Sequence, residues 1–300
     1  MSIGSWWLTQ KQRFGHGPVT AWYRDRVRPR ILDTAPITDT VDGRVELHVM
    51  TCAVDWLDLM WGLKSFYSAS ARRYRLCIHE DGSLSDDALG ALSLHFPHAR
   101  IILRRDADIE MEERLADYPF TAEFRRNNLL APKVTDFVAY LDAERMLLFD
   151  SDLLFFSCPH GLLARLEDPN FTLNAFNADV QSAYVVSPEL AREAFNIFLL
   201  PLVNSGLGVI QADCARYEWL EEFLAVESVR TGHFWHIEQT MYALCGSRYG
   251  AELLPSEYAL SLDRGISDKP FRHYVGGIRH LLYREGIPAL LRAKTIDLRS

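Results

Sequence analysis

The sequence predicts an α/β protein with a mostly parallel central sheet flanked by helices. From residue 46 onward, apolar runs that suit short strands alternate with stretches of helical periodicity, which is the order typical of βαβ units. The run 146–149 is apolar at every position, which indicates a strand buried on both faces. With 300 residues and 48% hydrophobic residues, the chain is long enough to bury a large core.

The expected elements follow in order along the chain. Strands are predicted at 47–51, 74–78, 99–103, 146–149, 153–156 and 207–210, and helices at 56–67, 85–96, 133–142, 187–200, 214–226, 237–245 and 278–291. Ser85 precedes two acids and Ser187 precedes Pro188, so each serine is expected to be the N-cap of its helix.

The domain organisation is predicted to be simple. Residues 1–44 contain scattered glycines and prolines without a sustained period, and we interpret them as an N-terminal extension. Residues 45–300 show no internal repeat, low-complexity tract or clear linker. We therefore expect one domain there, with an elaborated C-terminal half.

Composition excludes several classes of function. The net charge is -8 and the basic residues are scattered, which argues against nucleic-acid binding. No apolar run approaches the length of a membrane span, so we expect a cytoplasmic protein. The five cysteines are far apart and odd in number, and we expect reduced core thiols. The amphipathic stretch 278–291 suits core packing or peripheral contact with a membrane.

The strongest chemical signal is the Asp150-Ser151-Asp152 run directly after strand 146–149. Ligands of parallel sheets bind beyond the carboxyl ends of the strands, and two carboxylates are costly there unless a cation neutralises them. Mg²⁺ and Mn²⁺ prefer oxygen ligands and commonly bridge a protein to a diphosphate. The run therefore predicts a divalent metal site, although an Asx-turn pair at a strand end would look the same.

Further motifs follow in an order that resembles one family. A strand ends in Glu80-Asp81-Gly82, Lys133 lies on the helix before the central strand, and Leu148 to Asp152 read Leu-Phe-Asp-Ser-Asp. The later features are Asn204-Ser205-Gly206, Glu238-Gln239 and His273-Tyr274. Over roughly residues 45–285 this resembles the nucleotide-diphospho-sugar glycosyltransferases of the GT-A fold, particularly the glycogenin-like and bacterial galactosyltransferase-like group, whose sheet is Rossmann-like.

The resemblance implies a metal-dependent glycosyltransferase with a UDP-sugar donor and retention of stereochemistry. It implies Mn²⁺, or Mg²⁺, held by Asp150, Asp152 and His273, while His280 remains the alternative third ligand because the Lys-Pro-Trp that usually follows the family's histidine is absent. It further implies that Glu238 and Gln239 are catalytic residues that face the donor sugar or the acceptor, with Glu238 a candidate base or charge stabiliser, although an acid at a helix start is favourable without any function. Nucleotide and substrate contacts are expected from Thr51, Asp81, Lys133, Asp150, Ser151, Asn204, Ser205 and Gly206.

Several alternatives stay open at this stage. Lys133 also suits a solvated helix position, Asp81-Gly82 an ordinary turn, and 204–206 a polar turn before a strand. A nucleotidyltransferase of related fold needs a Gly-rich basic loop after the first strand, and the segment from Thr51 onward lacks one. A non-catalytic nucleotide- or carbohydrate-binding protein is the remaining alternative. The acceptor is expected to be a glycan, a lipid or a protein.

Overall fold

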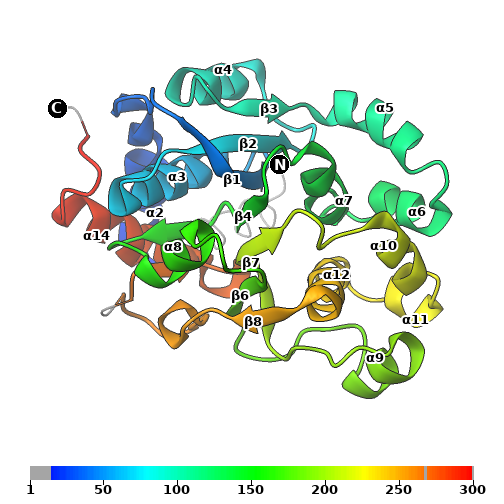
Figure 1. Cartoon of the computed structure of the whole chain (residues 1–300). Coiled ribbons are helices and arrows are strands. Elements are labelled where there is room, and N and C mark those ends of the chain that lie inside the picture. The colour runs from blue at the N-terminus through cyan, green and yellow to red at the C-terminus, as the bar shows by residue number, and fades with distance from the viewer. Residues whose placement is uncertain (1–14, 267–268, 299–300) are drawn as a thin grey trace, which may run out of the picture.

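A seven-stranded sheet forms the centre of the molecule in the computed structural model, which describes residues 15–266 and 269–298 (Figure 1). The strand order is β3-β2-β1-β4-β7-β6-β8, with β3, β2, β1 and β4 parallel and β7 antiparallel to both neighbours. The strands are β1 (Val41–Thr51), β2 (Tyr74–Glu80), β3 (Arg100–Ile102), β4 (Arg145–Phe149), β6 (Asn174–Ala178), β7 (Val203–Gln211) and β8 (Ala251–Leu253). The predicted α/β class is confirmed.

Helices cover both faces of this sheet (Figure 1). They are α2 (Pro18–Trp22), α3 (Trp56–Ser70), α4 (Asp86–His95), α5 (Arg104–Arg114), α6 (Pro119–Asn127), α7 (Ala131–Tyr140), α8 (His160–Glu167), α9 (Pro188–Phe195), α10 (Tyr217–Leu224), α11 (Glu227–Arg230), α12 (Phe234–Tyr249), α13 (Arg279–Leu281) and α14 (Ile287–Arg292). Short 3-10 and π segments are η1 (Tyr23–Val27), η2 (Arg28–Asp33), η3 (Ser256–Tyr258), η4 (Gly276–Ile278) and η5 (Leu282–Gly286).

The central strand β4 separates two hydrophobic cores. Leu147 and Phe149 point into the core that contains α3 and α8, while Met146 and Leu148 point into the core that contains α7 and α12. Alternate residues of a strand face opposite sides, so an uninterrupted apolar run is what a strand with two covered faces requires. The sequence prediction for this strand is confirmed on both faces.

Helix starts follow the predicted caps. Ser85 accepts a hydrogen bond from the Ala88 amide at the start of α4, and Ser187 accepts one from the Leu190 amide at the start of α9. However, α9 ends at Phe195, earlier than predicted, because Asn196 adopts a left-handed conformation with φ 55°.

Two sequence expectations require correction. Residues 204–206 do not form a turn before a strand but lie inside β7, which begins at Val203. The amphipathic C-terminal stretch breaks into η4, α13, η5 and α14, and its Leu281, Leu282, Ile287 and Leu290 are buried in the core. These side chains are thus covered by the protein itself and do not form an apolar outer face for a membrane.

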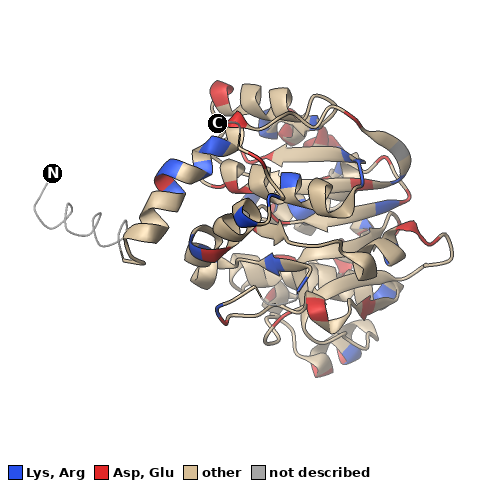
Figure 2. Cartoon of the chain, turned by 90° about the vertical axis from the view of Figure 1, so that its left-hand side faces the viewer, with Lys and Arg blue, Asp and Glu red and all other residues tan. Residues whose placement is uncertain are grey.

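The N-terminal residues that the structure describes pack on the sheet domain. Ile31 is completely buried, and the Trp61 indole donates a hydrogen bond to the Arg28 carbonyl. Acidic and basic residues are interspersed over this side of the molecule (Figure 2), which agrees with the absence of a basic stripe in the sequence. No helix within 15–266 or 269–298 is long and apolar enough to cross a bilayer.

Candidate metal and nucleotide site

A cavity of about 680 Å³ opens at the carboxyl ends of the central strands. Every site residue predicted from the sequence lines it, although the predictions came from segments far apart along the chain. These residues are Thr51, Asp81, Lys133, Asp150, Ser151, Asp152, Asn204, Ser205, Gly206, Glu238, Gln239 and His273. The fold therefore brings these polar residues together at the edge of the sheet where ligands of α/β proteins bind.

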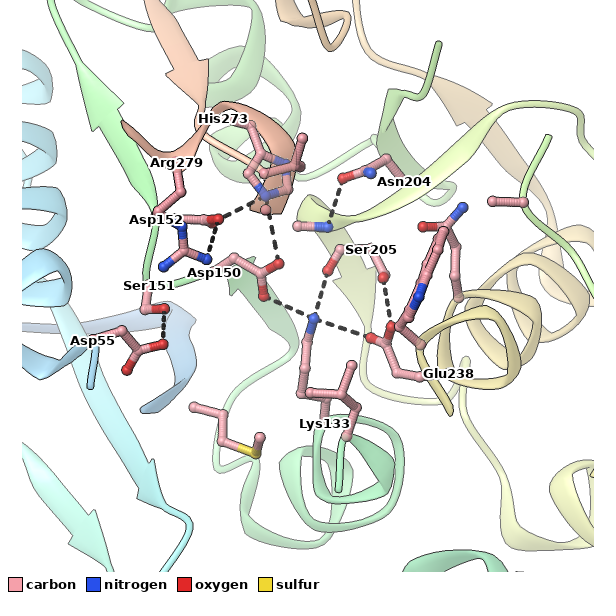
Figure 3. Close-up of a pocket in the computed structure, with 18 of the residues that line it drawn as sticks. Asp55, Lys133, Asp150, Ser151, Asp152, Asn204, Ser205, Glu238, His273 and Arg279 are labelled. Carbon is pink, nitrogen blue, oxygen red and sulfur yellow. Dashed lines mark hydrogen bonds and ion pairs between the residues drawn. The ribbon is translucent and has the colours of Figure 1, made fainter. Parts of the chain in front are cut away.

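Asp150, Asp152 and His273 converge on one point of the cavity (Figure 3). The His273 Nε2 lies 3.0 Å from Asp152 Oδ1 and 3.7 Å from Asp150 Oδ2. One ligand atom from each residue lies within 4.8 Å of the others. Two carboxylates and one imidazole at this spacing fit a divalent cation such as Mn²⁺, and Asp150 is partly exposed at the cavity.

Pairing within a second, two-stranded sheet places His273 beside the two aspartates. β5 (Leu153–Phe155) pairs antiparallel with β9 (Phe271–His273), and Leu153 is opposite His273 in the register. The Tyr274 amide also donates to the Asp152 carbonyl at 3.0 Å. His280, the alternative ligand, instead stacks on His16 with ring centroids 3.9 Å apart. The third member of the cluster is therefore fixed by strand pairing.

Gly206 lies against the His273 ring. A Cβ atom on Gly206 would meet His273 Cε1 at 2.2 Å and Nδ1 at 2.6 Å, so only glycine leaves room for the imidazole. The Gly206 carbonyl accepts a hydrogen bond from the Asp150 amide at 2.8 Å. Gly206 thus holds both the carboxylate strand and the histidine in place.

Lys133 is buried between two carboxylates beneath the cavity floor. Its Nζ lies 2.7 Å from Asp150 Oδ1 and 3.0 Å from Glu238 Oε1, and it donates to the Ser205 carbonyl at 3.1 Å. Burial alone would lower the pKa of Lys133, but Asp150 and Glu238 outweigh it and raise the pKa above its ordinary value. Lys133 is therefore a permanent cation at the site.

Glu238 faces Lys133 and accepts a hydrogen bond from the Ser205 hydroxyl at 2.8 Å. Burial raises the pKa of Glu238 despite the neighbouring ammonium. Gln239 extends toward Asp179 instead, with 3.4 Å between its Nε2 and Asp179 Oδ2. A carboxylate engaged by a lysine and a serine is suited to positioning these groups, whereas Gln239 and Asp179 remain at the cavity wall.

Three site residues escaped the sequence analysis. Asp55 accepts hydrogen bonds from the hydroxyls of Thr51 at 2.8 Å and Ser151 at 2.6 Å, and so joins the end of β1 to the Asp-Ser-Asp run. Asp179 directly follows β6 and accepts a hydrogen bond from the Asn204 amide at 2.9 Å. For Asp179 the available signal was an acid at a strand end, the same signal that identified Asp150, whereas Asp55 is the N-cap residue of α3.

Arg279 is the third of these residues and brings a second cation to the cavity. Its Nη2 lies 2.6 Å from Asp152 Oδ2 (Figure 3). Burial would raise the pKa of Asp152, yet His273 and Arg279 together lower it, so this carboxyl is held ionised. Burial would lower the pKa of His273, but Asp152 and Asp150 outweigh it and raise the pKa above its ordinary value.

Comparison with known proteins identifies the fold. No protein-family model matches the chain, and no curated protein matches it in sequence. Among solved structures, the galactosyltransferase LgtC in complex with donor and acceptor sugar analogs aligns with a TM-score of 0.56 and 14% identity over 85% of this chain and 97% of its own. Mouse xyloside xylosyltransferase 1 aligns with a TM-score of 0.50 and 11% identity over 78% of this chain and 98% of its own.

A third structure, the bifunctional glycosyltransferase WbbM, aligns with a TM-score of 0.52 and 14% identity. The alignment covers 80% of this chain but only 47% of WbbM, so the chain spans about half the length of that protein. At identities this low, the alignments establish the fold, and the activity has to be inferred from the residues of the site. The sheet order, the strand-end cavity and these alignments together confirm that the chain has the GT-A fold expected from its motifs.

Proposed function

We propose that this protein is a metal-dependent glycosyltransferase that moves a sugar from a nucleoside-diphosphate donor, with UDP as the nucleotide, to an acceptor hydroxyl. The proposal rests mainly on one observation. The cluster of Asp150, Asp152 and His273 lies in one cavity of about 680 Å³ together with two cations, Lys133 and Arg279. Such a volume is typical of a small-molecule site.

The charges of the site suit a departing diphosphate. A divalent ion bound to Asp150, Asp152 and His273 would neutralise the negative charge that develops on the leaving phosphate oxygen. Arg279 adds a guanidinium beside Asp152 with its hydrogen-bond donors fixed in a plane, which suits phosphate oxygens. Lys133 keeps Asp150 ionised and oriented through its 2.7 Å contact. Arg279 thus faces the leaving group, whereas Lys133 acts through Asp150.

The remaining residues divide between nucleotide and sugar. Thr51 and Asp81 line the cavity from the ends of β1 and β2, where the nucleoside is expected. Asn204, Gln239 and Asp179 offer amide and carboxylate groups at the opposite wall, where sugar hydroxyls need both donors and acceptors. Buried Glu238, paired with Lys133, stabilises positive charge nearby and orients Ser205.

The mouth of the cavity supplies a surface for the acceptor. Phe234 and Trp235 begin α12, line the cavity and are 42% and 39% exposed. Leu129, Val180 and Leu262 also line it with exposed side chains. The Asn128 amide donates to the Phe234 carbonyl at 2.8 Å, which places the aromatic pair beside Leu129. Aromatic faces at such a rim suit the apolar face of a sugar ring.

Calorimetric titration of UDP, first with Mn²⁺ and then with EDTA, tests the proposal. We expect binding that requires Mn²⁺ and that Asp152→Asn abolishes, while Asp87→Asn, an exposed first-turn acid of α4 outside the cavity, leaves binding unchanged. Failure of UDP to bind under any metal condition would refute the UDP assignment. UDP binding without sugar transfer or donor hydrolysis from any UDP-sugar would favour the non-catalytic alternative.

A further inference from the structure

A second cluster of metal-binding side chains lies inside the central sheet, away from the cavity. His48 on β1 and Cys77 and His79 on β2 are each no more than 3% exposed. His48 is opposite Cys77 in the parallel register, and Cys77 and His79 are two residues apart on one strand. Alternate residues of a strand share a face, so the backbone directs all three side chains to the same side of the sheet.

The three ligand atoms converge as a metal ion requires. His48 Nδ1 lies 3.1 Å from His79 Nε2, Cys77 Sγ lies 3.4 Å from the same nitrogen, and all three atoms are within 4.8 Å of one another. Zn–N bonds of about 2.0 Å and Zn–S bonds of about 2.3 Å at tetrahedral angles separate two nitrogens by about 3.3 Å and nitrogen from sulfur by about 3.5 Å. The two distances to His79 Nε2, 3.1 Å and 3.4 Å, lie within a few tenths of an ångström of these values.

Glu46 fixes the orientation of one of these rings. Its Oε2 lies 3.1 Å from His48 Nε2 and accepts a hydrogen bond from the Asp142 amide, while Arg100 Nη2 lies 2.8 Å from Oε1. An ionised Glu46 places the imidazole proton on His48 Nε2 and leaves the Nδ1 lone pair directed at the cluster. A carboxylate behind a metal-binding histidine is the usual outer partner in zinc sites.

Hydrogen bonding alone leaves this cluster poorly matched. Because Nε2 of His48 carries its proton toward Glu46, Nδ1 of His48 can only accept, and His79 Nε2 must donate to it. Cys77 then has no acceptor at His79 Nε2 for its thiol proton, although Sγ lies 3.4 Å away. Phe137 lies against both rings, with its centroid 4.5 Å from that of His79 and 5.4 Å from that of His48. Two imidazoles and a thiol, each able to bind a metal ion, therefore meet beside an apolar ring without a complete set of hydrogen bonds.

We propose that His48, Cys77 and His79 form a second metal site, which binds Zn²⁺ through two imidazole nitrogens and a thiolate. On binding, the Cys77 thiol releases its proton to solvent and the His79 proton moves from Nε2 to Nδ1, so both nitrogens present lone pairs. Thiolate and imidazole select zinc, whereas the Asp150, Asp152 and His273 cluster selects harder cations. The site ties β1 to β2 and is independent of the glycosyltransferase assignment.

Cobalt substitution tests this proposal, because only a thiolate ligand gives a sulfur-to-cobalt charge-transfer band. The full-length protein would be produced in zinc-depleted medium supplemented with Co²⁺, so that the ion enters during folding. We expect about one equivalent of Co²⁺ that resists dialysis against EDTA, with an intense near-ultraviolet charge-transfer band. Protein from ordinary medium should retain zinc at the same stoichiometry by elemental analysis.

Three variants assign the band. Cys77→Ser should lose it, whereas Cys214→Ser, which alters another fully buried free thiol, and Asp152→Asn, which alters the cavity cluster, should keep it. Absence of the band in folded wild-type protein, judged by circular dichroism, would overturn the proposal and leave the cluster as a hydrogen-bonded relay. A band that survives Cys77→Ser would overturn it equally. The wild-type spectrum decides even if Cys77→Ser fails to fold.

Discussion

Substitution of Gly206 by alanine tests the metal site without changing any ligand. The new Cβ would lie 2.2 Å from His273 Cε1, whereas carbon atoms pack at about 3.5 Å, so the ring must move by roughly 1 Å. His273 is 4% exposed and its backbone is held by the pairing of β9 with β5, so the ring must leave its position beside Asp152. Overpacking of this kind costs about 1–3 kcal/mol, which corresponds to about 5- to 150-fold in an equilibrium constant.

We therefore expect Gly206→Ala to bind Mn²⁺ about 5- to 150-fold more weakly than wild type, measured by electron paramagnetic resonance of free Mn²⁺. Gly276→Ala is the matched control, because Gly276 lines the same cavity and its added Cβ would meet nothing within 4 Å. Wild-type Mn²⁺ affinity in a folded Gly206→Ala protein would show that His273 is not a ligand. Equal loss in both variants would refute the steric argument.

Three further predictions concern stability. Burial raises the pKa of Asp58 to about 6 from an ordinary 3.8, so this group favours folding below pH 4 and loses that contribution as pH rises through 6. Between pH 4 and 7.5, the free energy of unfolding in urea should therefore fall by roughly 3 kcal/mol more in the wild type than in Asp58→Asn. Identical pH profiles would contradict this. Lys133→Gln leaves Asp150 and Glu238 without their cation and should lower the free energy of unfolding of the metal-free protein by about 3–5 kcal/mol. Adding Glu238→Gln should recover part of this loss. No recovery would mean that charge is not the cause. Ser187→Ala removes the cap of α9 and should lower the free energy of unfolding by about 1 kcal/mol while Mn²⁺-dependent UDP affinity stays unchanged.

The predicted fold rested on patterns that neighbouring residues determine. The strand at 146–149 and the helix starts at Ser85 and Ser187 were correct because apolar runs and caps act over a few residues. β1 begins at Val41, earlier than predicted, because Val41 already pairs with Tyr74 of β2 ahead of an irregularity in the register between Val41 and Glu46. The polar 204–206 segment lies within β7 because Asn204 pairs with Asn177 of β6 and the Gly206 carbonyl accepts a hydrogen bond from the Asp150 amide, contacts that the local pattern does not reveal.

The site was predicted in part. The Asp-Ser-Asp run was recognisable because a strand end and its carboxylates are adjacent in sequence. Asp55, Asp179 and Arg279 were missed because each resembles an ordinary helix start, loop acid or helix arginine until its partner is known. Their contacts with Ser151, Asn204 and Asp152 cross between elements, and no local pattern encodes such a contact.

The sequence by itself determined the α/β class, the buried central strand and twelve of the residues that line the cavity. Only the tertiary structure decided between His273 and His280, since the choice depends on β9 pairing with β5 beside Asp152. It also decided that Lys133 lies buried between Asp150 and Glu238 and is not solvated. The physical reason is the same in both cases: local patterns fix which residues end each element, whereas charge pairing and metal geometry depend on distances that packing alone sets.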